Sequence, residues 1–252
     1  MASRETTTLQ FPLPDGGMVP LLKVRDRRSR RLRLTVSERG VRLSVPWRLP
    51  EREAMAFVQG HADWIDRQWQ RLRSTQLPVE WACGAISLLP LAGAERPVEW
   101  IEARHARVEV GEDATTLRFH APRAASSALL RRALLEFYAA EARAAIHRWL
   151  PTYLPGLPRP PSGFRLRALR SLWGSLAPDG TVSLDLALLL GPPAVFEYVL
   201  VHELCHLIHA NHSPAYWREV EARCPDWREA RAFLRSGAGL GLKTRLHALT
   251  KA

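Results

Sequence analysis

Cysteine is scarce in this chain of 252 residues. Its three cysteines, Cys83, Cys205 and Cys224, are an odd number, and no two of them have the C-x-x-C spacing. Disulfide frameworks and cysteine-based structural zinc sites use even sets of cysteines at short spacings. The sequence therefore predicts neither, and a hydrophobic core must hold the fold together. The chain is long enough to bury one.

Long hydrophobic runs are also missing. No apolar stretch reaches the roughly 18 to 20 residues that cross a bilayer. The opening "MASRETTTLQFPLPDGG" has no basic segment followed by an apolar one, which a secretory signal requires. With 46% hydrophobic and 24% charged residues, the composition is that of an ordinary globular protein. We therefore expect a cytoplasmic protein without a membrane partner.

Lysine occurs only at positions 23, 243 and 251, although the net charge is +11. Nearly all of the positive charge is therefore arginine. Such a charge favours nucleic-acid binding through neutralisation of phosphates. A coding bias toward arginine produces the same composition without any polyanionic partner, and we favour this explanation. The charge describes the surface field rather than the fold.

The N-terminal part contains a hairpin pattern followed by a helical pattern. "RRLRLTV" (30–36) and "GVRLSVP" (40–46) alternate polar residues with Leu and Val, and "SERG" lies between them as a turn. They predict a β-hairpin with one basic face. Residues 49–73 predict an amphipathic helix. Its apolar side chains at helical spacing are Ala56, Phe57, Trp64, Ile65 and Trp69.

Short strands and a long helix follow. Residues 79–120 contain four strand-like stretches separated by Gly, Pro and charged breaks. The Ala- and Leu-rich stretch 125–154 predicts a long helix. Residues 164–189 predict a strand, a tight turn at "APDG" and a second strand. Next comes a helix rich in histidine, and then two helices separated by Pro225.

This order of elements predicts an α+β fold. The densest run of Pro and Gly, at 151–163, is the best candidate for a break between a β-rich N-terminal part and a catalytic C-terminal part. We expect a hairpin, helix and strand module over residues 1–122 and a catalytic domain over 123–236. The Gly-rich, basic residues 237–252 predict a flexible tail.

The histidine-rich helix carries the strongest functional pattern in the chain. "GPPAVFEYVLVHELCHLIHANH" (191–212) starts with two prolines, which suit a first helical turn. His202 and His206 are one turn apart, so both imidazoles project from one face and can bind one Zn²⁺. Glu203 is rotated by about 100° from His202, where it can act as the general base toward a zinc-activated water. A catalytic zinc site of this kind hydrolyses peptide bonds.

A catalytic zinc usually has a third protein ligand. We favour His212, because Asn211 tolerates the left-handed conformation that ends a helix and the chain can then turn back toward the metal. The resulting spacing, H-E-x-x-H-x5-H, is that of metzincins. His209 is the rival because it stays on the same helical face. A carboxylate such as Glu219 or Glu221 is a weaker alternative.

Residues 172–234 resemble the YgjP-like metallopeptidase domain of bacteria. The features that carry the resemblance are W-G-S at 173–175, Y-V-x-x-H-E-L-x-H at 198–206 and N-H-S-x-x-Y-W at 211–217. Residues 27–46 and 57–68 resemble the opening hairpin and helix of the same family, and the likeness is loosest over 79–150.

The resemblance implies a zincin-like fold similar to SprT-like and WLM proteases, with a small antiparallel sheet, the active-site helix and C-terminal helices. It implies one zinc per chain on His202, His206 and His212, with Glu203 as the base. Two positions depart from the pattern. Leu176 stands where Cys is common, and Asp185 stands where Asn is common.

The resemblance also implies where a peptide lies. In such folds the strand before the active-site helix forms the rim of the cleft, to which an extended peptide adds as a further strand. This places Trp173, Gly174 and Ser175 near the substrate, although core packing explains Trp173 equally well. Tyr216 could donate its hydroxyl to an oxyanion, but we expect it to pack beneath the helix with Trp217.

The sequence is compatible with three functions. The first is a zinc metallopeptidase acting on a peptide or protein. The second is a nucleic-acid-associated protease resembling SprT-like enzymes, anchored through Arg28, Arg30 and Arg31 of the basic hairpin. The third is a non-catalytic binding module that a metal stabilises. The sequence does not name the substrate or the oligomeric state.

Overall fold

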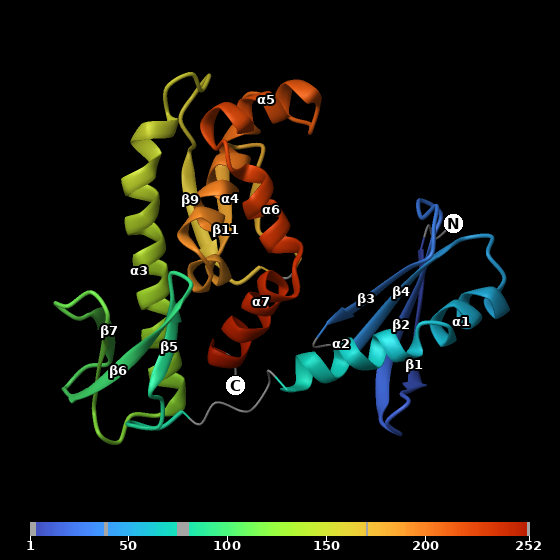
Figure 1. Cartoon of the computed structure of the whole chain (residues 1–252), viewed down its shortest axis with the longest axis horizontal. Coiled ribbons are helices and arrows are strands. Elements are labelled where there is room, and N and C mark those ends of the chain that lie inside the picture. Colours follow the sequence, from blue (N-terminus) through green and yellow to red (C-terminus); the bar gives the residue numbers. More distant parts are fainter. Residues whose placement is uncertain (1–3, 38–39, 75–80, 170, 251–252) are drawn as a thin grey trace. The chain divides into compact units, whose positions relative to one another are not determined.

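The computed structural model describes residues 4–37, 40–74, 81–169 and 171–250. The chain forms two compact units, Met1–Leu77 and Pro78–Ala252, called unit 1 and unit 2 below. In the described residues we find seven α-helices and three small sheets, so the expected α+β class is confirmed (Figure 1). None of the described helices is both long enough and apolar enough to cross a bilayer.

Unit 1 is a four-stranded sheet with helices packed on one face. The strands are β1 (Arg4–Pro12), β2 (Met18–Asp26), β3 (Arg33–Ser37) and β4 (Gly40–Pro46), in the order β1-β2-β4-β3. The antiparallel pairing of β3 with β4 confirms the predicted hairpin, whose turn residues 38–39 lie outside the described part of the chain. The sequence analysis did not find β1 and β2.

The predicted helix over 49–73 is two helices, α1 (Glu51–Gln59) and α2 (Ala62–Ser74), separated at Gly60. Their buried side chains are Ala54, Val58 and Ile65, which join strand residues such as Leu21 and Leu43 in the core of unit 1. Ala56 and Trp64 are exposed, whereas Phe57 and Trp69 are half-buried against this core.

Unit 2 begins with a second four-stranded sheet. Its strands are β5 (Leu88–Leu91), β6 (Ala94–Glu102), β7 (Arg107–Val110) and β8 (Leu117–Ala121), in the order β5-β6-β8-β7. The long helix α3 (Ser127–Tyr153) starts at Ser126, whose hydroxyl accepts a hydrogen bond from the backbone N–H of Leu129. A serine in this position satisfies one of the unpaired N–H groups of the first turn.

The boundary predicted between residues 122 and 123 is not where the units divide. Buried residues of the β5–β8 sheet, such as Leu89 and Phe119, belong to one hydrophobic cluster with Leu134 of α3 and Leu200 of the histidine-rich helix. The same cluster continues on both sides of the Pro-rich stretch 151–163. Shared burial, which local composition does not reveal, therefore joins these strands to the C-terminal part.

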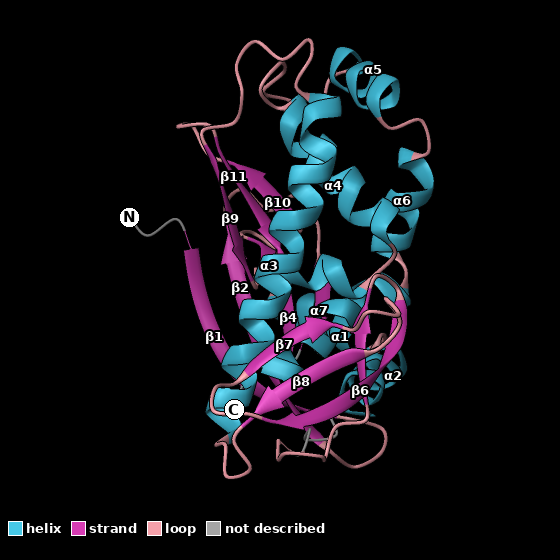
Figure 2. Ribbon diagram, turned by 90° about the vertical axis from the view of Figure 1, so that its left-hand side faces the viewer, coloured by secondary structure: helices cyan, strands magenta, loops and turns pink. Residues whose placement is uncertain are grey.

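A three-stranded sheet and four helices complete unit 2 (Figure 2). Strands β9 (Gly163–Arg167), β10 (Gly174–Leu176) and β11 (Thr181–Asp185) have the order β10-β11-β9. The predicted small antiparallel sheet is a mixed one, because β9 runs parallel to β11 and only β10 is antiparallel to it. After the 3₁₀ helix Leu186–Leu190 come α4 (Pro193–Cys205), α5 (Pro214–Arg223), α6 (Trp227–Arg235) and α7 (Gly237–Thr250).

The prediction of a flexible tail from residue 237 is wrong. Residues 237–250 form the helix α7, which buries Leu246 and Leu249 in the core of unit 2. Its Gly239 is needed for close packing, because a Cβ there would lie 2.2 Å from the carbonyl oxygen of Phe233 in α6. The glycines therefore permit contact between two helices.

Candidate metal centre

Helix α4 carries the first two histidines and is buried on most sides. Pro192 and Pro193 form its start, and its buried residues include Phe196, Leu200 and Leu204. A helix that is apolar all round is stable only inside a core. The packing of α4 therefore fixes the direction in which His202 and Glu203 point.

The chain turns back directly after α4. The helix ends at Cys205 with His206 as its last cap, and residues 206–208 form a turn. Helix α5 then begins after Ser213, whose hydroxyl accepts a hydrogen bond from the backbone N–H of Tyr216. The proposed left-handed Asn211 is wrong, because the non-glycine residues with positive φ in the described chain are Ala92 and Ala114. The reversal happens earlier, at the turn.

This reversal brings three imidazoles together. One nitrogen from each of His202, His206 and His212 lies within 4.8 Å of the other two. The Nε2 atoms of His202 and His212 are 3.1 Å apart, and the ring centres of the three pairs are separated by 4.7 to 5.1 Å. Among the described residues, this is the group of His, Cys, Asp and Glu side chains that can hold a metal ion.

The alternative third ligands have other contacts. His209 contributes its backbone carbonyl, which lies 3.1 Å from Nδ1 of His206 and leaves Nε2 of that ring free to face the other two. A hydrogen bond of this kind fixes the tautomer and orientation of a ligating histidine. Glu219 forms an ion pair with Arg223, and Glu221 forms one with Arg228.

Burial favours the neutral form of His202 and His212. It lowers the pKa of His202 to about 3, and the other two histidines and Arg231 contribute in the same direction. Burial also lowers the pKa of His212. A metal binds the neutral imidazole, so this burial prepares His202 and His212 as ligands. Three imidazole nitrogens that lie this close together fit a metal ion that accepts nitrogen ligands.

Glu203 lies in a narrow space between α4 and β10. The residue is 5% exposed, and a Cβ added to Gly174 would lie 2.7 Å from Oε1 and 2.8 Å from Cγ of this side chain. Burial raises the pKa of Glu203 to about 7, while a hydrogen bond from the backbone N–H of Leu176 acts in the opposite direction. The edge strand thus both confines the carboxylate and donates to it.

The strand β10 contains Gly174 and Ser175 of the predicted substrate segment, and Trp173 precedes it. Among the described residues it pairs with β11 alone, so its other edge is unpaired. Trp173 is half-buried and packs against the core of unit 2. Its ring also lies under the ammonium group of Lys243, 4.4 Å from the ring centre.

Tyr216 packs beneath the cluster, as expected. It is fully buried, and its hydroxyl donates to the backbone carbonyl of His202 at 2.9 Å. Its ring is stacked on His206 with ring centres 4.6 Å apart. The sequence analysis missed two further contacts, namely the stacking of Trp217 on His212 and the cation–π contact of Arg231 with Trp217. In the sequence, the Tyr-Trp pair at 216–217, shortly after His212, was the pattern that could have indicated aromatic packing at this site.

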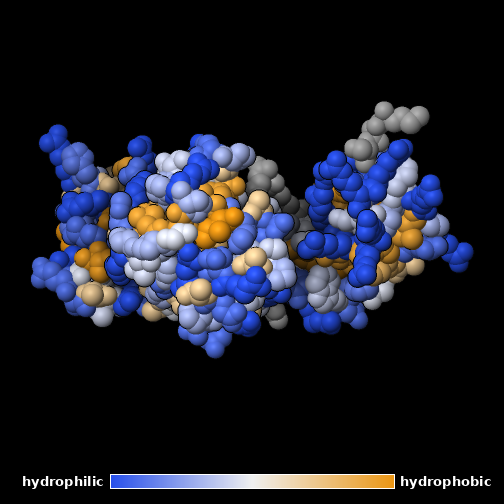
Figure 3. Space-filling view, turned by 90° about the horizontal axis from the view of Figure 1, so that it is seen from above, coloured by the Kyte–Doolittle hydropathy of each residue, from blue (hydrophilic) through white to orange (hydrophobic). Residues whose placement is uncertain are grey.

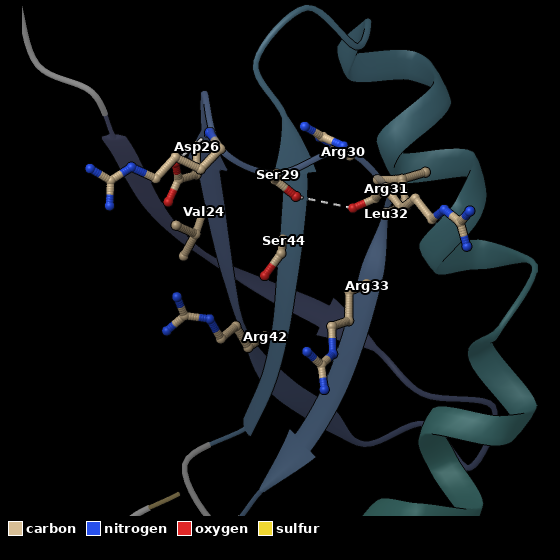
Figure 4. A pocket seen from close by; sticks show the side chains of 10 residues that line it. Val24, Asp26, Ser29, Arg30, Arg31, Leu32, Arg33, Arg42 and Ser44 are labelled. Atoms are coloured by element: carbon tan, nitrogen blue, oxygen red, sulfur yellow. Dashed lines mark hydrogen bonds between the residues drawn. The ribbon is translucent and has the colours of Figure 1, made fainter. Parts of the chain in front are cut away.

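The arginines predicted to bind nucleic acid lie in unit 1. Arg28, Arg30 and Arg31 line a shallow cavity of about 550 Å³, together with Arg33 and Arg42 (Figure 4). The predicted anchor named only residues of the loop. The two strand residues belong to the basic face predicted for the hairpin, where they alternate with Leu34 and Leu43, which face the core.

Comparison with known proteins identifies the family. A family model described as the YgjP-like metallopeptidase domain matches residues 30–237. No curated protein matches the chain. A solved structure, the metallopeptidase zymogen of Pyrococcus abyssi abylysin, is 26% identical and covers 40% of this chain and 93% of its own. Its TM-score of 0.26 is too low to inform the fold.

The family match starts before β3 and ends where α7 begins, so it covers the second part of unit 1, most of unit 2 and the whole histidine cluster. The expected family is therefore confirmed. The chain belongs to the YgjP-like metallopeptidase family, which makes it a peptide hydrolase of a kind that uses a metal ion.

Proposed function

We propose that the chain is a zinc-dependent peptidase in which Glu203 is the general base. The observation that carries the proposal is the convergence of three imidazoles, with the buried carboxylate of Glu203 next to His202 on α4. Zinc on His202, His206 and His212 would supply a Lewis acid that acidifies water and polarises the scissile carbonyl.

The carboxylate of Glu203 has the environment that a general base needs. A base works best when its pKa is near the working pH, and burial moves this carboxyl group in that direction. The N–H of Leu176 favours the ionised form. An oxygen of Glu203 then accepts a proton from the attacking water and later delivers it to the amine that leaves.

Because Gly174 has no side chain, the space beside it is open to the Glu203 carboxylate. Any side chain at this position would overlap Glu203, because the added Cβ would lie closer to Oε1 than real Cβ atoms approach other atoms. We therefore assign Gly174 a positioning role for the base. The glycine of the W-G-S sequence is explained by this contact with the active-site helix.

The unpaired edge of β10 supports the proposed location of the substrate. A peptide that adds to this edge gains main-chain hydrogen bonds regardless of its sequence. It would lie next to Gly174 and Ser175, in front of Glu203. The half-buried Trp173 precedes this strand and supports it from the core side.

The first prediction concerns the metal. We expect about one zinc per chain in the purified protein by elemental mass spectrometry, since a catalytic site has three protein ligands and one open position. His212→Ala should lose most of this zinc. His209→Ala is the matched control and should retain it, because His209 contributes only its carbonyl oxygen to His206. Equal loss in both variants would contradict the assignment of His212.

The second prediction concerns Glu203. Glu203→Gln should keep its zinc and lower kcat toward a peptide substrate by about a hundredfold or more, as for the loss of a general base. Glu221→Gln changes the same group on an exposed side of α5 and should leave kcat unchanged. If Glu203→Gln is as active as the unmodified protein, the non-catalytic, metal-stabilised module becomes the better explanation.

The third prediction concerns Gly174. Gly174→Ala should keep its zinc but lower kcat by about ten- to a hundredfold, because a displacement of about 1 Å in a catalytic group has costs of this size. Gly163→Ala is the matched control in strand β9 of the same sheet, where an added Cβ meets nothing within 4 Å. If the kinetics of Gly174→Ala are unchanged, the Glu203 carboxylate can act without the space at Gly174, and the positioning role of this glycine is contradicted.

A second candidate function, binding of nucleic acid, is favoured by the arginine-lined face of unit 1. Arg33 lies opposite Ser44, and Arg42 lies opposite Thr35, so these side chains share the face that the helices do not cover. The guanidinium groups of Arg30, Arg31, Arg33 and Arg42 point in different directions (Figure 4). Such a spread suits a polymer with repeated negative charges better than one small anion.

The arginines of this face have no ion-pair partner in the described part of the chain. No ion pair among the described residues involves Arg28, Arg30, Arg31, Arg33 or Arg42. The one acidic residue that lines the cavity, Asp26, accepts a hydrogen bond from the backbone N–H of Arg28. Figure 3 shows hydrophilic residues over much of the part of unit 1 in view, on its right-hand side.

Charge reversal tests this candidate. Arg33→Glu with Arg42→Glu should weaken binding of a fluorescent DNA duplex at least tenfold in fluorescence anisotropy, and should flatten the dependence of affinity on salt. The matched control, Arg52→Glu with Arg67→Glu, makes the same charge change on exposed positions of α1 and α2. Equal weakening by both pairs, or no binding by the unmodified chain at low salt, would leave coding bias as the explanation.

A further inference from the structure

Lys243 connects the C-terminal helix to the segment that leads into the rim of the active site. Its ammonium group donates to the backbone carbonyls of Leu169, at 3.1 Å, and Leu172, at 2.8 Å. It also forms an ion pair with the carboxylate of Asp185 and lies over the ring of Trp173. An ammonium group has three hydrogens to donate, and these three oxygens account for all of them.

Asp185 holds the same segment from the other side. It is the last residue of β11 and is 2% exposed. Its backbone N–H donates to the carbonyl of Trp173 at 2.9 Å, and its Oδ1 accepts from the N–H of Ala187 at 2.9 Å. Burial raises the pKa of Asp185 and the charge of Lys243 lowers it, so the buried carboxylate depends on this lysine for its ionised form.

The helix that carries Lys243 lies outside the part of the chain that matches the family. The match ends at residue 237, whereas α7 spans Gly237–Thr250. The contacts of Lys243 are therefore a feature of this chain that the family assignment does not provide.

We propose that α7 acts as a brace for the active site and that Lys243 is a positioning residue for Glu203. The ammonium group fixes the residues before β10, and β10 in turn places Gly174 and the N–H of Leu176 against the Glu203 carboxylate. The proposal rests on the proposed function in one respect, namely that Glu203 is the base. The brace itself is defined by contacts that do not depend on the reaction.

A competing explanation is that Lys243 only balances the charge of buried Asp185. Removal of one partner of a buried ion pair is strongly destabilising because the other charge is left uncompensated. The two explanations predict different results when the charge of Asp185 is removed together with that of Lys243. Asp185→Asn restores neutrality, but an asparagine cannot replace the hydrogen bonds from Lys243 to the two carbonyls or its contact with Trp173.

The experiment compares Lys243→Met with the double variant Lys243→Met/Asp185→Asn in the full chain. Arg245→Met is the matched control, because it removes another cation from α7 together with an ion pair to Glu95 of β6. Each protein is measured for kcat and KM with a peptide substrate, zinc content, thermal stability, and hydrogen exchange of the peptide that contains residues 171–176.

We expect Lys243→Met to lose thermal stability, to keep its zinc and to show a kcat lowered about ten- to a hundredfold. The double variant should regain thermal stability but neither the kcat nor the slow exchange of residues 171–176. Arg245→Met should resemble the unmodified protein in kcat and in this exchange.

Recovery of both kcat and slow exchange in the double variant would overturn the brace and leave charge balance as the role of Lys243. Unchanged exchange in Lys243→Met would also overturn it. If the unmodified chain does not cleave any peptide tested, the proposed function fails, while the exchange of residues 171–176 still decides whether α7 holds this segment.

Discussion

The contact between Glu203 and the strand β10 is the constraint on which the rest of the site depends. A carboxylate at this depth is stable only if its surroundings supply both space and a hydrogen bond. Gly174 supplies the space and the backbone of Leu176 supplies the hydrogen bond. Because both groups belong to one short edge strand, the position of that strand decides where the base can reach.

Burial, which raises the pKa of this carboxylate, also favours the neutral form of His202 and His212. Loss of solvent disfavours the charged form of every group, so it raises the pKa of an acid and lowers that of an imidazole. Glu203 and His202 are adjacent on α4 and show shifts in these opposite directions. One physical cause therefore prepares a proton acceptor and a set of metal ligands in the same place.

The sequence predicted those parts of the site that depend on local spacing. The separation of His202 and His206 by one helical turn placed both imidazoles on one face, and the short distance in sequence to His212 made a return of the chain possible. The turn that achieves this return was assigned to Asn211, but it lies at residues 206–208. The rings of Tyr216 and Trp217, which come from the next helix α5, pack against His206 and His212 after this reversal, and the helical spacing within α4 does not reveal such contacts.

The glycines of α7 show why the C-terminal part could not be predicted. A Gly-rich, basic stretch at a chain end usually indicates fraying, but here Gly239 allows α7 to approach α6 closely and the helix then buries Leu246 and Leu249. The same helix explains the unusual Asp185. An aspartate buried at the end of β11 would be costly alone, and Lys243, one of only three lysines in the chain, forms an ion pair with it from α7. The two residues are 58 positions apart, so the acidic residue is understood only together with a helix that lies beyond the family match.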